Sequence, residues 1–584
     1  MITHFDKYKV EIYRNLKFVT PEGGIFPHTA SVTFLSKTNE EIAYFELGYL
    51  FTDEIYEKIY KGEELNLSHC YIRNFSLTAY RKYYDLPKYS PVKIRKFSAA
   101  HSFFESYIAT DFSYAIIEDG VFEIENSYFL RGNLLFNNAR LGSGKKNFSY
   151  ILIRKGNLDF TNTEFGDGDV VFKNSVFGSG ETSFHDSVFG KGEKNFSNVD
   201  FGDGDVLFIH TMFGDGKVNF KIAKFGDGIK DFHYSSFGKG DISFERAEFG
   251  NGEVNFSKID FGAGKLNFNR AVFGTGQVSF EGSELKNGKA TFKKAIFGEG
   301  TLNFEITDFS SSLLVLDKAD FSASKISFNG AKIGTLSFKS CNIDRYLDMR
   351  VEYCGELDLS DSIVRDIIDF FPDDNKVHIE NLHFEGMRLL GNLLIDWEKN
   401  NLYRLIISQK NTDFMQKAEQ FRTLKKNFSD IGRYDDEDRA YVEFKRFEEK
   451  AKLLQILAKN RWNALWYYPL YWFKMLVFDK VGHYATNPVR VLFSMLVVYS
   501  SFSLTYFVLM LLKWGDIVSG IGGEHAEIPL LAKSFFFGAI TFLTIGYGDF
   551  YPMGAIRGLS AAEGFIGVFL MSYFTVAFVR KILR

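Results

Sequence analysis

Residues 165–212 read FGDGDVVFKNSV, FGSGETSFHDSV, FGKGEKNFSNVD and FGDGDVLFIHTM, four consecutive segments of 12 residues. The first Phe recurs every 12 residues from Phe165 to Phe309, with Leu285 as the exception, and a second Phe follows seven residues after it. Weaker copies extend the register back to Ile117 and forward to Phe328, which makes 18 copies. Such repetition indicates a solenoid, in which each repeat packs only against its neighbours.

The repeat is incompatible with helix. Gly stands one and three residues after the first Phe, and each Gly inside a helix costs about 1 kcal/mol. Gly suits corners that need a positive φ, and the short runs VVF, VLF and EVNF suit brief strands. We therefore expect a β-solenoid.

The five-residue half of the repeat resembles the pentapeptide repeat, whose coil has four faces with a central Leu or Phe pointing inward. The resemblance covers about residues 117–365, and the seven-residue half looks like the same face with a Gly-x-Gly insertion. Pentad spacing returns at Ile333, Phe338 and Ile343. Two repeats per four-sided turn predict a coil of 24 residues and nine coils, about 43 Å long at ~4.8 Å per strand step.

Composition excludes several classes of protein. The chain has 584 residues and a net charge of -4, without the strongly basic footprint of a nucleic-acid binder. Three cysteines, at positions 70, 341 and 354, are too few for a disulfide framework, so we expect the soluble part in the cytosol. The charged N-terminal residues predict no signal peptide. GSGKK at 142–146 lacks the pattern of a phosphate-binding loop, and no calcium-ligand position is maintained in FGDGD.

The C-terminal part predicts two membrane spans. Residues 491–512 carry no charge, and residues 558–579 are interrupted only by Glu563; each stretch gives about 33 Å of helix, enough for a ~30 Å hydrocarbon core. Residues 532–543 are apolar but too short to span. Trp and Tyr residues mixed with Arg461 and Lys474 favour an interfacial segment over a buried aromatic helix.

Residues 541–549 read TFLTIGYGD. This segment resembles the potassium-channel pore signature TxxTxGYGD, which lies between two spanning helices. The resemblance implies that a dehydrated K⁺ is bound by backbone carbonyls, which replace its water shell. It assigns this ion-binding role to Thr544, which adds its hydroxyl, and to Ile545, Gly546, Tyr547 and Gly548.

The resemblance also assigns supporting positions. Gly546 and Gly548 supply the left-handed backbone that points successive carbonyls inward. Thr541 supports the filter, and Asp549 lies at the extracellular mouth. In some relatives an acidic residue braces that Asp, but the corresponding position here is Ile540.

Non-helical backbone at membrane depth is tolerated only where protein buries it or where it lines a water path, so a fourfold ring of copies is implied. We therefore expect a homotetramer in the lipid bilayer. Lys and Arg gather before the first span and after the second, at Arg580, Lys581 and Arg584. Positive-inside counting predicts a multi-pass protein of the cell membrane with both termini in the cytoplasm.

Two residues of the second span have open roles. Glu563 either hydrogen-bonds behind the filter or senses protons, or it is a carboxylate that reaches solvent near the outer interface. Gly567 lies near the place of an inner-helix gating glycine, offset by about one position, or it is a small packing residue.

We expect a multidomain chain. Its parts are an N-terminal cap region (1–95), a cytoplasmic β-solenoid (96–400), a linker with a pair of helices (401–460), the interfacial aromatic segment (461–488) and the pore domain (489–584), with the first span at 491–512, the pore helix at 532–543, the filter at 544–548 and the second span at 558–579.

The predicted function is a potassium-selective ion channel, not an enzyme, whose solenoid regulates or scaffolds the pore. Permeant K⁺ is the only ion or cofactor implied, no nucleic acid is expected, and a cytosolic ligand or protein is a candidate partner. One alternative is a non-selective cation channel, which an Asp in place of Tyr547 would have favoured. Another is a membrane-anchored solenoid interaction protein; mimicry of DNA would need an acidic surface, but 141–332 carries a net charge of about -2.

Overall fold

The structure is a computed structural model that describes residues 2–321, 324–372, 377–410, 412–520 and 528–583. The chain divides into two compact units, Met1–Gln409 and Lys410–Arg584. The first is a β-solenoid with an N-terminal cap, and the second is helical.

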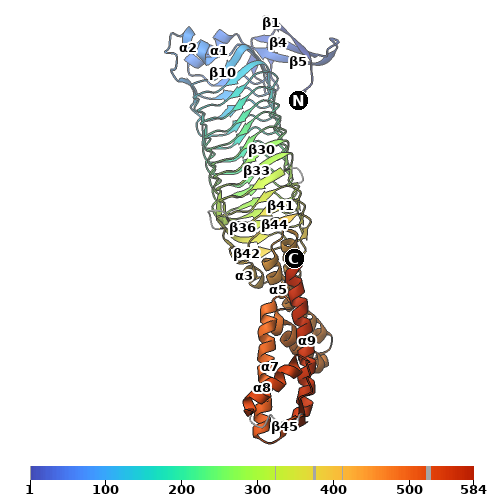
Figure 1. Ribbon diagram of the computed structural model, residues 1–584. Helices are drawn as coiled ribbons and strands as arrows, with labels where there is room; N and C mark the ends of the chain where they lie inside the picture. The colour runs from blue at the N-terminus through green and yellow to red at the C-terminus, as the bar shows by residue number, and fades with distance from the viewer. Residues whose placement is uncertain (1, 322–323, 373–376, 411, 521–527, 584) are drawn as a thin grey trace. The chain divides into compact units, whose positions relative to one another are not determined.

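The first unit is a stack of four-sided coils (Figure 1). β18 (Val170–Val171) pairs in parallel with β22 (Lys194–Asn195), so that Val170 lies opposite the residue 24 positions later. The same step joins β16 (Leu158–Asp159) to β20 (Thr182–Ser183). These registers confirm the predicted coil of two 12-residue repeats.

Two faces of the coil carry continuous parallel ladders. One consists of β6 (Leu65–Asn66), β9 (Phe97–Ser98), β12 (Phe122–Glu123), β14 (Lys146–Asn147), β18, β22, β24 (Val218–Asn219), β26 (Ile242–Ser243), β28 (Lys265–Asn267), β31 (Lys289–Thr291), β34 (Asp308–Val315), β36 (Lys332–Ser337), β39 (Tyr353–Asp358) and β42 (Ile379–His383).

The other ladder consists of β7 (Cys70–Arg73), β10 (Phe103–Asp111), β13 (Tyr128–Leu135), β16, β20, β23 (Val206–Leu207), β25 (Lys230–Asp231), β27 (Val254–Asn255), β30 (Gly276–Ser279), β33 (Gly300–Asn303), β35 (Ser324–Ser327), β38 (Leu347–Asp348), β41 (Ile367–Asp369) and β44 (Asn392–Leu394). The remaining faces are held by short pairs such as β29 (Val272–Phe273) with β32 (Ile296–Phe297), and by isolated bridges.

The solenoid is longer than the regular repeat predicts. The first ladder has 14 strands, against the nine coils expected from the 12-residue period. Coil length varies outside the regular part: Ile326 pairs with Leu347, and Leu65 pairs with Phe97. Part of this variation is a register shift within paired strands: Phe309 of β34 pairs with Ile333, 24 positions later, but Leu313 pairs with Thr335, 22 positions later.

A column of stacked phenylalanine rings fills the regular coils. The ring centroid of Phe232 lies 4.8 Å from that of Phe208 and 4.9 Å from that of Phe256, one coil away on either side. Phe220 and Phe244 meet the same ring edge-on, each at 5.9 Å. Offset stacks and edge-to-face pairs are the arrangements that aromatic quadrupoles favour.

The predicted positive φ is confirmed at many of the recurrent glycines, such as Gly202 and Gly262, but not at all of them. The regular left-handed position is two residues after the second Phe, where non-glycine residues such as Asn174, His210 and Tyr234 have φ between 53° and 60°. Gly204 has no positive φ, but a Cβ there would overlap the carbonyl oxygen of Gly180 in the coil before. Many of the recurrent glycines are therefore required by the close approach of neighbouring coils rather than by corner geometry.

An antiparallel sheet closes the N-terminal end of the core. It consists of β1 (Lys7–Tyr13), β4 (His28–Leu35) and β5 (Glu41–Tyr49), and β5 also pairs with β7 of the coil. Phe34 of β4 packs on Phe103 and Tyr128 of the first coils. The helices α1 (Thr52–Tyr60) and α2 (Leu77–Tyr83) lie in this region, which protects an otherwise open end of the aromatic core, while α3 (Leu402–Ile407) follows the last strands.

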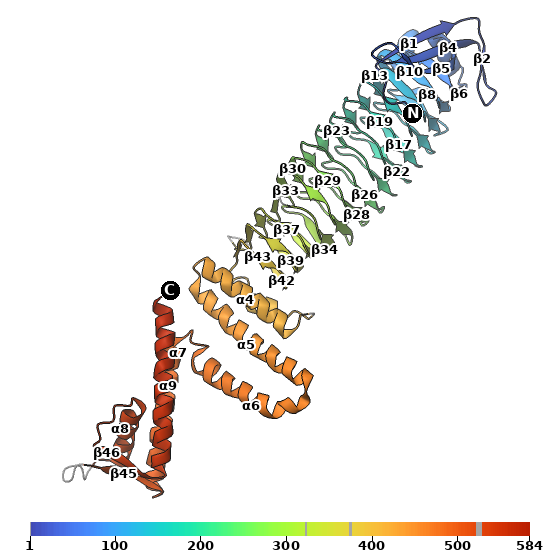
Figure 2. The same cartoon turned by 90° about the vertical axis from the view of Figure 1, so that its right-hand side faces the viewer.

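The second unit begins with two long helices, α4 (Phe414–Asp430) and α5 (Tyr434–Lys459), which lie side by side in Figure 2. The aromatic helix α6 (Ala464–Lys474) runs into a π-helical segment, Met475–Lys480. The apolar helices are α7 (Pro488–Leu511), α8 (Leu530–Phe542) and α9 (Ile556–Ile582), and β45 (Gly515–Ser519) pairs antiparallel with β46 (Phe550–Gly554).

Three lysines lie inside the solenoid at a repeat position that is mostly aliphatic: Lys146, Lys194 and Lys230. The Nζ of Lys194 donates hydrogen bonds to the carbonyl oxygens of Gly190, at 2.6 Å, and Asp215, at 2.8 Å, and the other two ammonium groups also donate to backbone carbonyls. Burial lowers the pKa of each lysine to about 8. Backbone carbonyls thus accept hydrogen bonds from all three ammonium groups, and nearby carboxylates such as Asp167 and Asp215 partly offset the effect of burial on the pKa.

Truncation of one interior ring tests the packing. Phe232→Ala should lower the free energy of unfolding of the 1–409 unit by about 3–5 kcal/mol, because Phe232 is fully buried among other phenylalanine rings. Thermal and denaturant unfolding followed by circular dichroism measure this change. Tyr234→Ala, two residues away and half-exposed, is the matched control. Equal stability of the two variants would show that the inward register is wrong.

The buried lysines predict a pH dependence of stability. Their folded-state pKa of about 8 lies below the ordinary value of 10.5, so between these values the unfolded chain binds more protons and raising the pH favours the folded state. The gain is at most about 3 kcal/mol for each lysine.

The experiment compares unfolding of the wild type and of a Lys146→Met, Lys194→Met, Lys230→Met variant from pH 7.5 to 10.5. The wild type should gain stability relative to the variant over this range. A constant difference between the two would mean that the ammonium groups keep an ordinary pKa.

Candidate functional site: the loop after α8

The segment after α8 leaves helical geometry at once. Leu543 still donates to carbonyls of the last helical turn, and the N–H of Thr544 donates to the carbonyl oxygen of Thr541 at 3.1 Å. Ile545 donates back to the carbonyl oxygen of Ile540 at 2.9 Å. The helix end therefore holds the start of the loop through its own unpaired carbonyls.

The loop backbone takes the left-handed conformation at its two glycines, as the sequence suggests. Gly546 has φ 59° and Gly548 has φ 82°, the left-handed region in which Gly has no steric cost. Thr544 also has a positive φ, 54°, which the sequence did not indicate. Within the described parts of the chain, the carbonyl oxygens of residues 544–547 accept no hydrogen bond.

The loop is exposed in the single chain. The side chain of Tyr547 is 71% exposed, and a Cβ built on Gly546 or Gly548 would meet no atom within 4 Å. Asp549 is anchored differently, because its carbonyl oxygen accepts from the N–H of Gly520 at 2.8 Å. One carboxylate oxygen of Asp549 is buried without a partner among the described residues, and the side chain of Ile540 belongs to the apolar core.

The supporting helices enclose a buried polar cluster. Glu563 on α9 is fully buried, and its Oε2 accepts a hydrogen bond of 2.7 Å from the hydroxyl of Tyr506 on α7. Its Oε1 and the Oγ of Ser503 have no partner among the described residues, and both border Gly538 on α8. The interpretation of Glu563 as a solvent-reaching carboxylate is therefore wrong: it faces the helices behind the loop.

Gly567 is a packing residue in this structure. It is buried in a continuous α9, and a Cβ there would overlap the carbonyl oxygen of Phe542 at the end of α8. Tyr506, Ser503 and Gly538 were missed by sequence reasoning. The hydroxyls of Tyr506 and Ser503 inside an apolar span were the available signal, because polar groups in such spans usually find partners.

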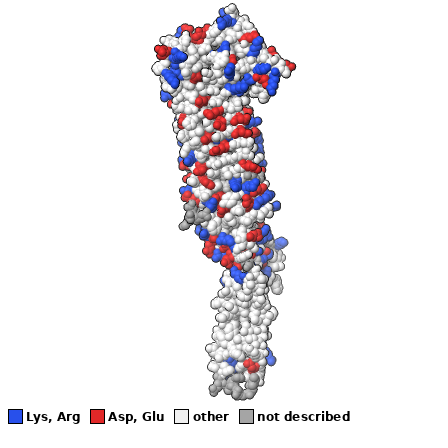
Figure 3. All heavy atoms as spheres, turned by 45° about the horizontal axis from the view of Figure 1, so that its top comes forward, with Lys and Arg blue, Asp and Glu red and all other residues white. Residues whose placement is uncertain are grey.

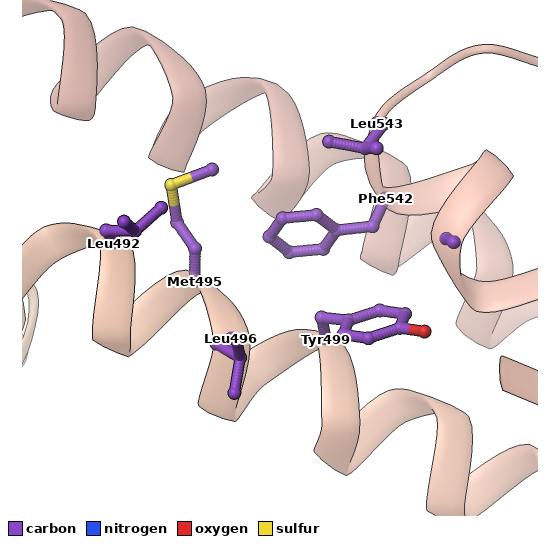
Figure 4. A pocket seen from close by; sticks show the side chains of 7 residues that line it. Leu492, Met495, Leu496, Tyr499, Phe542 and Leu543 are labelled. Atoms are coloured by element: carbon purple, nitrogen blue, oxygen red, sulfur yellow. The ribbon is translucent and has the colours of Figure 1, made fainter.

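An apolar hollow of about 290 Å³ lies between α7 and the end of α8. Figure 4 shows its lining, which includes Leu492, Met495, Phe542 and Leu543. The hydroxyl of Tyr499, at its edge, donates to the carbonyl oxygen of Phe535 at 3.0 Å. This lining offers no ligand for an ion, so the chemistry of the region lies in the loop backbone.

Two helices of this unit, Pro488–Leu511 and Ile556–Ile582, are long and apolar enough to cross a membrane by length and composition. In Figure 3 the visible surface of the apolar helices carries almost no charged side chains along its length, whereas acidic and basic side chains cover the solenoid. No residue of α6 is buried, and Trp462, Trp466 and Trp472 are each more than 60% exposed. That exposure fits an aromatic segment at the membrane interface.

Residues 494–584 match the model of a protein family described as "Ion channel". The matched region contains nearly all of α7, together with α8, the loop and α9. With the two apolar helices, this match indicates an ion channel of the two-transmembrane type in the membrane. Neither the curated proteins nor the solved structures contain a match to the chain.

The close contact at Gly567 generates a prediction. Gly567→Ala should destabilise the helical unit by about 1–3 kcal/mol, because the added methyl group pushes α9 away from the end of α8. Gly558→Ala on the same helix is the matched control, since a Cβ there meets no atom within 4 Å. Thermal unfolding of the purified chain in detergent, followed by tryptophan fluorescence, measures both. Similar melting of the two variants would contradict this packing role.

Proposed function

We propose that this chain forms a potassium-selective channel in the cell membrane. The observation that carries the proposal is the TIGYGD loop: the carbonyls of residues 544–547 accept no hydrogen bond from the described residues, and its glycines have left-handed backbone. The loop lies between two helices long and apolar enough to span, in the region that matches ion channels. Carbonyl oxygens held at this spacing can replace the hydration shell of K⁺. Thr544, Ile545, Gly546, Tyr547 and Gly548 would coordinate the ion.

The proposal includes a homotetramer. A loop with unpaired carbonyls and an exposed Tyr547 cannot face lipid, because each unsatisfied polar group there costs several kcal/mol. Four copies around an axis would turn the carbonyls toward a shared water path and cover the tyrosine ring. The carboxyl end of α8 would direct its negative partial charge toward permeating cations.

The proposed topology places both termini in the cytoplasm. Lys and Arg are concentrated before α7 and at the end of α9, at Arg580 and Lys581, and the positive-inside rule assigns such ends to the cytoplasm. The solenoid and its cap then lie in the cytoplasm, where they regulate the pore or scaffold a ligand or protein. Asp549 would lie at the extracellular mouth, with Thr541 supporting the filter from below.

Ion-substitution currents of the reconstituted channel test selectivity. Bi-ionic reversal potentials should favour K⁺ over Na⁺ by about ten-fold or more, which corresponds to at least about 1.4 kcal/mol. Tyr547→Asp should reduce this ratio while the protein still assembles. Tyr551→Asp, on β46 outside the loop, is the control that should keep selectivity.

Near-equal permeability of K⁺ and Na⁺ in the wild type would replace the proposal by a non-selective cation channel. Absence of any current would favour a membrane-anchored interaction protein. The same recordings on a chain without residues 1–409 separate the two roles of the solenoid. An altered open probability indicates regulation, and an unaltered one with changed assembly or partner binding indicates a scaffold.

A further inference from the structure

The first turn of α5 contacts the carboxyl end of α9. The Nη2 of Arg580 lies 3.0 Å from Oδ1 of Asp438. The Nζ of Lys581 lies 2.9 Å from Oδ1 of Asp435 and 3.2 Å from Oδ2 of Asp438. Two basic residues at the end of the second span are thus paired with acidic residues in the soluble helix.

The Arg580–Asp438 pair is partly shielded from solvent, whereas the side chain of Asp435, which pairs with Lys581, is 88% exposed. The side chains of Asp438 and Arg580 are 11% and 23% exposed, and the guanidinium of Arg580 lies over the ring of Tyr441, 4.5 Å from its centroid. Charge pairs in such a setting are screened less by salt than exposed pairs. Arg580 also combines an ion pair with a cation–π contact, which orients it on α5.

The same helix α5 also contacts the segment that precedes the first span. Arg446 donates to both carboxylate oxygens of the buried Asp479, at 2.8–3.1 Å, and Glu449 accepts from Lys474 at 3.0 Å. Tyr573 on α9 completes the arrangement: its hydroxyl donates to the carbonyl oxygen of Phe478 at 2.9 Å. α5 therefore contacts the entry to α7 and the end of α9.

This arrangement changes the expected route of regulation. From connectivity alone, any signal from the solenoid enters the pore through the outer helix, because the linker joins the chain only there. The contacts of Asp435 and Asp438 give a second route that bypasses α7. A shift of α5 would act directly on the end of α9.

We propose that the acidic turn of α5, Asp435 and Asp438, is a latch that couples the cytoplasmic region to the inner helix of the pore. The inference rests on the proposed channel function and specifies its regulation. Coupling between two sites requires a contact whose energy differs between two states of the pore. The ion pairs join separate elements, α5 and α9, through side chains, so a displacement of α5 relative to α9 would change their energy.

Charge reversal and charge exchange in the full-length channel test the latch. Single-channel recordings in bilayers compare the wild type with Asp438→Lys, Arg580→Glu and the Asp438→Lys, Arg580→Glu exchange. Each single reversal should change the open probability in the same direction by roughly 5-fold to 150-fold, the usual range of coupling between sites. The exchange should return it to within about two-fold of the wild type. Unit conductance and the K⁺ to Na⁺ permeability ratio should stay constant in all three.

Asp430→Lys is the matched control, an exposed acidic residue at the end of α4 that receives the same change of charge. If a reversal variant does not assemble, Asp438→Asn and Arg580→Gln remove the pair without repulsion and should change the open probability in that same direction. An unchanged open probability in the single variants, or an exchange that restores nothing, would overturn the latch. A wild type without K⁺ current would instead overturn the proposed function, so the two failures are distinguishable.

Discussion

A backbone carbonyl in the hydrocarbon core of a membrane must meet a hydrogen-bond donor, water or a cation, because lipid offers none of these. Among the described residues, the consecutive carbonyls of 544–547 have no hydrogen-bond donor, and the left-handed glycines keep the loop from continuing the helix. The other elements of the helical unit position this loop. α8 ends where the loop begins, and α7 and α9 enclose α8 through Tyr506, Glu563 and Gly567. In the proposed function, a ring of copies satisfies these carbonyls, and K⁺ is the cation whose lost hydration they would replace.

In the solenoid, the backbone N–H and C=O groups find their hydrogen-bond partners in neighbouring coils. Every coil donates and accepts hydrogen bonds along the stack, so that the short strands are paired with their neighbours even though each has only a few residues. Phenylalanine rings exclude water from the interior, and glycine at the crowded positions lets coils approach. The buried Lys146, Lys194 and Lys230 donate hydrogen bonds to backbone carbonyls. The result is a stack of coils whose stability is approximately a sum of nearest-neighbour terms.

The parts of the fold that follow a regular sequence repeat could be predicted, and the irregular parts could not. The 24-residue coil follows from the spacing of Phe165 and its equivalents, because a local period reports directly on the register of a solenoid. The extension of the ladder back to Leu65 could not be found, since the coils there differ in length and their Phe residues recur at unequal spacing. The polarity of Glu563 is visible in the sequence, but its direction depends on how Tyr506 packs. The pairing of Asp438 with Arg580 joins residues 142 positions apart and has no local signal.

The central claim is that four copies of the loop together form a binding site for dehydrated K⁺. Thermal stability of the purified protein in K⁺ and in Na⁺, at equal ionic strength, tests it most directly, because a ligand that binds only the folded assembly stabilises it by mass action. The account predicts that the assembly melts at a higher temperature in K⁺ than in Na⁺, and that Gly548→Ala abolishes the difference. Equal melting in the two salts, or dissociation into single chains that retain the full K⁺ effect, would contradict it.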